Sequence, residues 1–103
     1  MKPTKIKDIQ YGSKPKIANI VATGRFPKSV DIVKVYKFLD LPIKEYEPES
    51  YPGLLVKVKV NGKLRHVTIY KNGKYIITGA TSPDDVMDTY ETIFNLLKEA
   101  GYF

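Results

Sequence analysis

Apolar and polar residues alternate along the middle of the chain in the pattern of β-strands. Between Leu54 and Val60 every second residue is apolar, which is the period of a strand buried on one face. Asn61-Gly62 and Asn72-Gly73 are strong signals for tight hairpin turns. Because these signals fall between apolar runs, the pattern predicts antiparallel neighbours. The predicted strands cover residues 16–23, 54–60, 64–71 and 74–78.

Two other stretches have the apolar spacing of helices. Ser29 or Asp31 can cap a short helix that Pro42 stops. Ser82, followed by a proline and two aspartates, is typical of a helix start, and Gly101 is the expected stop. The order strand, helix, several antiparallel strands and long helix predicts an α+β fold. Both helices must then cover one face of the sheet and leave the other face open.

The charges are distributed unevenly along the chain. From Gly53 to Thr78 the sequence has no Asp or Glu, and its cations there are Lys57, Lys59, Lys63, Arg65, Lys71 and Lys74. The predicted long helix after Ser82 is acidic. A cationic sheet backed by an acidic helix attracts polyanions, above all nucleic acid.

Length and composition set further limits. With 103 residues and a net charge of +6, the chain is expected to form one domain over residues 16–103 after a flexible basic arm over residues 1–15. The absence of cysteine excludes disulfides and thiolate chemistry. Because no apolar run has membrane-spanning length and none reads as a secretion signal, we expect a cytoplasmic protein without membrane partners.

The sequence offers little for catalysis. His66 is the only histidine, and no nucleophile–base pair, glycine-rich phosphate loop or metal-ligand spacing accompanies it. Glu45, Glu47 and Glu49 are too close together and too exposed to suggest a tuned acid–base pair. We therefore expect neither an enzyme nor a bound metal or cofactor.

Several motifs resemble those of the TATA-box-binding protein family. In chain order they are Ile17–Thr23, Tyr46–Leu54, Ile69–Lys74, and Ile77–Ala80 followed by Ser82. Their order, and nearly their spacing, is that of one repeat of the family over residues 16–103. The resemblance implies a curved antiparallel sheet of about five strands with two helices on its convex face. The family has two such repeats that together grip DNA as a saddle, whereas this sequence has one.

The resemblance also implies roles for individual residues. Asn19 would contact the adenine N3 and thymine O2 acceptors of the minor groove, although by itself it reads as an exposed polar residue. Tyr51 and Tyr70 match phenylalanines that act as wedges between base steps. Tyrosine keeps the aromatic plane but adds a hydroxyl that must be solvated or paired. Shallower bending, stacking on single-stranded nucleic acid and a plain structural role are therefore open for both.

The predicted open face combines apolar groups with cations. Period-two counting places on it Val21, Leu55, Thr68, Ile76 and Thr78. Such a patch should be covered by DNA or by another protein, of which a second copy is the main candidate. The expected phosphate contacts are Lys57, Lys59, Lys71 and Lys74, with Arg65 as a further candidate. The alternative is that these cations serve only solubility.

Glu45, Glu47 and Glu49 cluster in an acidic loop that precedes Tyr51. In the family the matching loop meets transcription factor B, a protein with basic surfaces. The resemblance therefore implies a protein-binding role for these glutamates. The alternative is an acidic loop that is simply solvated.

These observations lead to two functional hypotheses. In the first, two copies pair at an exposed sheet edge, and the homodimer binds A·T-rich double-stranded DNA through the minor groove in transcription initiation or its regulation. In the second, the chain is a protein-interaction or accessory module that keeps the fold without binding DNA. Salt-dependent binding to an A·T-rich duplex distinguishes the two.

Overall fold

The structure is a computed structural model, and it describes residues 20–103. The predicted basic arm over residues 1–15, the start of the first predicted strand and Asn19 lie outside the described residues. The described elements are β1 (Ile20–Arg25), α1 (Ile32–Phe38), β2 (Ile43–Glu45), β3 (Leu54–Val60), β4 (Lys63–Ile69), β5 (Lys74–Ala80) and α2 (Pro83–Glu99).

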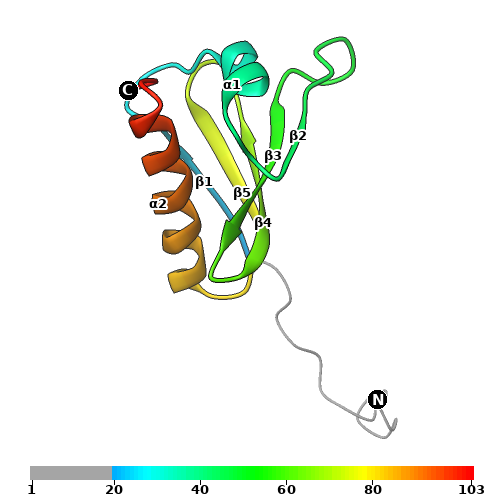
Figure 1. Ribbon diagram of the computed structural model, residues 1–103. Helices are drawn as coiled ribbons and strands as arrows, with labels where there is room; N and C mark the ends of the chain where they lie inside the picture. Colours follow the sequence, from blue (N-terminus) through cyan, green and yellow to red (C-terminus); the bar gives the residue numbers. More distant parts are fainter. Residues whose placement is uncertain (1–19) are drawn as a thin grey trace, which may run out of the picture.

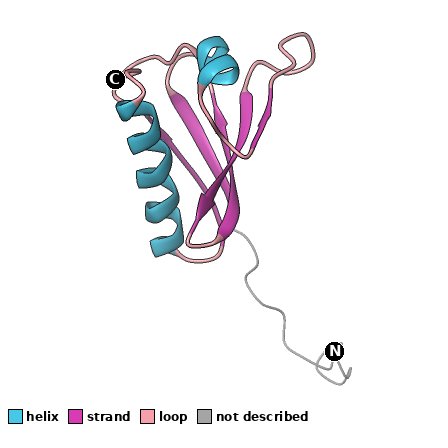
Figure 2. Ribbon diagram, in the orientation of Figure 1, coloured by secondary structure: helices cyan, strands magenta, loops and turns pink. Residues whose placement is uncertain are grey.

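The strands form one antiparallel sheet in the order β1-β5-β4-β3-β2. α2 lies along one face of this curved sheet, and α1 lies near the end at which α2 terminates (Figure 1). Within residues 20–103, no helix lies over the opposite face (Figure 2). The predicted fold class, an α+β arrangement of a curved antiparallel sheet and two helices, is confirmed. Neither described helix is long and apolar enough to span a membrane.

The core lies between the sheet and α2. Every second side chain of Leu54–Val60 is buried on the covered face, as the alternation predicts. α2 contributes Ile93 and Leu97, which are fully buried. The Phe26 ring packs 5.3 Å from the ring of Phe103, so the residues after α2 also close the core. Burying each such side chain stabilises the fold by about 1.5–3 kcal/mol.

The capping residues act as predicted. The Asp31 carboxylate accepts a hydrogen bond from the Lys34 N–H (3.2 Å), so Asp31 caps α1 and Ser29 does not. Ser82 Oγ accepts a hydrogen bond from the Asp85 N–H (3.0 Å) and caps α2. Both caps satisfy N–H groups that have no partner within their helix.

Both asparagine–glycine hairpins form. Asn61 and Gly62 have φ angles of 51° and 81°, the left-handed conformation that a two-residue turn of this kind requires. The second loop is closed by the Tyr70 N–H, which donates to the Lys74 carbonyl (2.8 Å), and contains Gly73 at φ 92°. These turns fix the strand register and thereby decide which side chains share a face.

Some boundaries differ from the prediction. β2 is a strand that the residue pattern does not predict, because an element this short shows no alternation, and its last residue, Glu45, belongs to the predicted acidic loop. β1 continues to Arg25, where a loop is predicted, because its pairing with β5 extends to Lys74. β5 continues to Ala80 past an irregularity at Gly79, whose φ is 84°.

Candidate nucleic-acid interface

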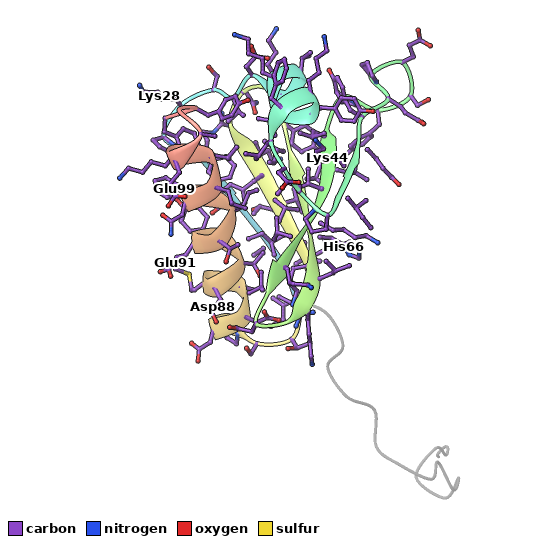
Figure 3. The ribbon with its side chains drawn as sticks, viewed as in Figure 1. Lys28, Lys44, His66, Asp88, Glu91 and Glu99 are labelled. Carbon is purple, nitrogen blue, oxygen red and sulfur yellow. The ribbon has the colours of Figure 1, made fainter. Side chains whose placement is uncertain are left out.

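The open face of the sheet, defined as the face opposite α2, presents its side chains in rows across the strands. The first row, in the order β3, β4, β5 and β1, is Leu55, Thr68, Ile76 and Thr23. The second row, in the order β3, β4 and β5, is Lys57, His66 and Thr78. Figure 3 shows His66 on the side of the sheet away from α2, whose own surface carries Asp88, Glu91 and Glu99.

The open face is apolar for a surface. Val21 is 65% exposed and Leu55 is 41% exposed, although both are large apolar side chains. Leu55, Thr68 and Thr78 line a shallow hollow of about 360 Å³ on this face. The strand period thus places the predicted apolar residues together, and contiguous exposed apolar groups mark a binding surface.

Cations flank the exposed apolar side chains of the open face. Toward the β3–β4 turn they are Lys57 and Lys59, and toward the β4–β5 turn they are Lys74 and Arg25. Three of the lysines that the sequence suggested as phosphate contacts, Lys57, Lys59 and Lys74, therefore lie on the open face. A surface of this kind offers apolar contact in the middle and positive charge on either side. Lys71 follows Tyr70 and lines a hollow with Gly101 and Tyr102 after α2, so the prediction that it contacts a phosphate on the open face is wrong.

Arg25 is a cation of this group that the sequence analysis missed. It is the register partner of Lys74, and its Nη1 donates to the Asn72 carbonyl (3.3 Å). The sequence around it reads as a loop because a proline follows closely. The signal that identifies it is the continued alternation after Val21 and Thr23, which places Arg25 on the open face.

Arg65 does not belong to the open face, and the prediction that it contacts a phosphate there is wrong. It lies on β4 between Leu64 and His66, so its side chain points to the face that α2 covers. Its Nε lies 2.9 Å from a carboxylate oxygen of Asp85, and its side chain is only 13% exposed. The prediction rested on the positive charge of Arg65 and did not use the alternation along the strand, which assigns this side chain to the covered face.

Asp85 joins the start of α2 to β4. Its carboxylate accepts hydrogen bonds from Arg65 Nε (3.1 Å) and from the Thr81 N–H (2.9 Å). These hydrogen bonds, the one from Arg65 foremost, hold the pKa of Asp85 below its ordinary value. The ion pair thus anchors α2 on the covered face of the sheet.

Tyr51 and Tyr70 lie together at one end of the open face. Tyr70 follows β4 and continues its open-face alternation, whereas Tyr51 precedes β3. Their hydroxyls form a hydrogen bond with each other. This hydrogen bond, together with burial, raises the pKa of Tyr70. The two residues that the resemblance singles out are therefore a pair in space.

The glutamates that the sequence groups in one loop are separated in the structure. Glu45 ends β2 and is the register partner of Leu55, so it lies at the edge of the open face. Glu47 and Glu49 are exposed in the loop between β2 and β3. Glu47 also lines a hollow with Leu55 and Thr68, so it lies close to the open face, whereas Glu49 does not line that hollow.

Comparison with known proteins finds one family. Residues 14–100 match the family model described as "Transcription factor TFIID (or TATA-binding protein, TBP)". The chain is 38% identical over 86 residues to TATA-box-binding protein C of Halobacterium salinarum, covering 84% of this chain and 46% of that protein. It is 33% identical over 98 residues to the TATA-box-binding protein of Sulfurisphaera tokodaii, covering 95% of this chain and 48% of that protein.

The structural comparison agrees with the sequence comparison. Methanococcus jannaschii TBP superposes with a TM-score of 0.70 at 31% identity, over 82% of this chain and 46% of that chain. The chain therefore spans about half the length of the relatives that it matches. The family description is that of a transcription factor and not of an enzyme, in agreement with the prediction. The chain belongs to the TATA-binding protein family, and it represents a single repeat of that fold.

Proposed function

We propose that this protein binds A·T-rich double-stranded DNA through the minor groove with its open face, as a homodimer, in transcription initiation or its regulation. The supporting observation is the open face itself, an uncovered sheet surface on which exposed apolar side chains, Val21 and Leu55 among them, lie between two groups of cations. Apolar side chains suit the sugars and base edges of the minor groove, and flanking cations suit the phosphates on either side.

The polar members of the rows fit the same partner. Thr68 and Thr78 lie on the open face, and a threonine hydroxyl can donate to adenine N3 or thymine O2. These acceptors are shared by A·T and T·A pairs, so such contacts favour A·T-rich sites without reading one strand. Asn19 is proposed to add a further donor of this kind.

The test is the affinity for an A·T-rich duplex, measured by fluorescence anisotropy over a range of salt concentrations. Each neutralised phosphate steepens the log–log salt dependence by about 0.9. With several cations per copy, the affinity should fall about 10³-fold or more between roughly 50 and 200 mM salt. A G·C duplex of equal length should bind more weakly. Salt-insensitive binding, or equal affinity for both duplexes, would contradict the proposal.

Homodimer formation is proposed from the sheet edges. In the described part of the chain, β1 pairs with β5 on one side only, so its other side offers backbone hydrogen-bonding groups. Val21 on this edge strand is also highly exposed. Pairing of β1 with a second copy would extend the open face into a two-fold symmetric surface.

Joining two copies by a long flexible linker tests the dimer. If DNA binding needs two copies, the linked protein should bind the duplex at least about 10²-fold more tightly per chain at low concentration, because pairing becomes intramolecular. The control is the single chain with the same linker attached. Equal affinity of the linked and single proteins, with one chain bound per duplex, would contradict the proposal that a homodimer binds DNA.

Glu47 and Glu49 are proposed to dock a protein with a basic surface, of which transcription factor B is the candidate. Replacing both by lysine should weaken capture of transcription factor B on a protein–DNA complex by about tenfold or more when variant and wild type are compared at equal occupancy of the duplex. The matched control is the pair Glu91→Lys and Glu99→Lys on α2. Unchanged capture would contradict the proposal that Glu47 and Glu49 bind transcription factor B.

A protein-interaction role without DNA is the second candidate, and Glu45 favours it. Its carboxylate lies at the edge of the open face beside Leu55, where it would repel phosphate. A protein partner could instead match both Glu45 and the neighbouring Lys57. The absence of any duplex binding in the salt titration would select this alternative.

A further inference from the structure

The phenol hydroxyls of Tyr51 and Tyr70 form a polar group at one end of the open face. One hydroxyl donates a hydrogen bond to the other. The ring centroids are 6.0 Å apart, and the ring planes are inclined by 59°. Because Tyr51 is 43% exposed, the joined hydroxyls can reach a molecule that covers this face.

Gly53 allows this arrangement of the two rings. A Cβ at this position would lie 2.8 Å from Tyr51 Cε2 and 3.1 Å from Tyr70 Cε1. It would also lie 2.8 Å from the Thr68 Cγ2 methyl group. Because glycine has no Cβ, both rings can pack over the backbone at position 53, which restricts how they tilt.

The geometry disfavours insertion of these rings between base pairs. A wedge between two base pairs is apolar and lies parallel to the bases that it separates. Rings inclined by 59° cannot both lie parallel to one base step. Insertion of either ring alone would break the hydrogen bond between the hydroxyls and enclose a phenol oxygen among apolar surfaces.

The same geometry favours contact with base edges. In the pair one hydroxyl uses its proton, so the other hydroxyl keeps its own proton as a free donor, and lone pairs remain as acceptors. A free donor suits adenine N3 and thymine O2, and a free acceptor suits the guanine N2 amino group.

We propose that Tyr51 and Tyr70 act as one hydrogen-bonded reader of minor-groove edges, so that this protein binds duplex DNA with little unstacking and tolerates G·C pairs beneath the tyrosines. This inference rests on the proposed function. The inference makes the proposed function more specific, because it names the substrate as a weakly bent duplex with a relaxed A·T requirement at the ends of the site.

The experiment measures bending and affinity separately on an end-labelled duplex of TA repeats. Fluorescence anisotropy gives the affinity, and energy transfer between the two ends at saturation gives the bend. The test variant carries Tyr51→Phe and Tyr70→Phe, which removes both hydroxyls and keeps both rings. Tyr51→Phe alone is a second variant. Tyr90→Phe on α2, whose ring stacks on Phe26 at the covered face, is the control for loss of a hydroxyl away from the open face.

Wild-type protein should change the energy transfer only slightly, and the double variant should change it about twofold more, because its apolar rings can enter a base step. On a duplex with G·C pairs toward the ends of the site, the double variant should lose about tenfold in affinity relative to wild type. The Tyr90→Phe control should match wild type in both measurements.

Equal bending by wild type and the double variant, with the same tolerance of G·C pairs, would overturn the tyrosine inference while the proposed function stands. Failure of all variants to bind the duplex, with wild type folded, would overturn both. The two failures are distinguished because affinity is measured before bending.

Discussion

Replacing both Lys57 and Lys59 by glutamate should weaken binding to an A·T-rich duplex on the order of 100-fold at low salt. Both side chains lie on the open face of β3, so each reversal removes one phosphate contact and adds a repulsive charge. The slope of the salt dependence should fall by about 0.9 for each lost contact. Both effects are measured in one series of anisotropy titrations.

A matched variant separates contact from total charge. Lys34→Glu with Lys98→Glu changes the net charge equally, but Lys98 lies on α2, and Lys34 lies on α1 in a hollow that it shares with Gly101 and Tyr102 after α2. This control should lose less than about tenfold, since only long-range attraction is reduced. Equal losses in both variants would mean that net charge, and not the open face, determines binding.

Replacing Asp85 by asparagine should lower the free energy of unfolding by roughly 2–3 kcal/mol near neutral pH. The change removes the charged partner of Arg65, whose side chain is only 13% exposed, and leaves the guanidinium poorly compensated. Asp84→Asn is the control, because Asp84 also lies in the first turn of α2 but is exposed. Urea unfolding followed by circular dichroism measures both variants.

The destabilisation caused by Asp85→Asn should depend on pH in a defined direction. The pKa of Asp85 is lowered from its ordinary value of 3.8 in the folded state, so this carboxylate stabilises the fold above that value. Its contribution is lost as the pH falls through the lowered pKa. The difference between wild type and Asp85→Asn should therefore shrink as the pH falls below 3.8, and a difference that is independent of pH would contradict the ion pair.

Local patterns were sufficient to predict most of the fold. The alternation over Leu54–Val60, the Asn61-Gly62 turn and the Ser82 cap each act within a few residues, and the structure contains all of them. The placement of Leu55 and Thr68 on one face follows from the strand period once the turn is known. Each of these features depends on residues that are close together in the sequence, so it can be predicted from the sequence.

Features that depend on pairing between distant segments were not predictable in the same way. β2 exists because Ile43 and Glu45 align with β3, which the residues of β2 alone do not indicate. The ion pair between Arg65 and Asp85 forms only because α2 packs across β4. The hydrogen bond between Tyr51 and its partner likewise depends on the β3–β4 hairpin, which brings together residues far apart in sequence.

The central claim is that duplex DNA covers the open face and leaves α2 exposed. Methyl NMR spectra test this claim directly, because each methyl signal reports on the surroundings of one side chain, and the chosen side chains lie on different faces of the molecule. On the open face the probes are the methyl groups of Val21, Leu55 and Ile76, and on α2 the probe is Met87, which is 53% exposed.

Adding an A·T-rich duplex should shift or broaden the Val21, Leu55 and Ile76 signals, with little change at Met87. Unchanged open-face signals beside a strongly perturbed Met87 would show that DNA binds α2 instead, and would contradict the account.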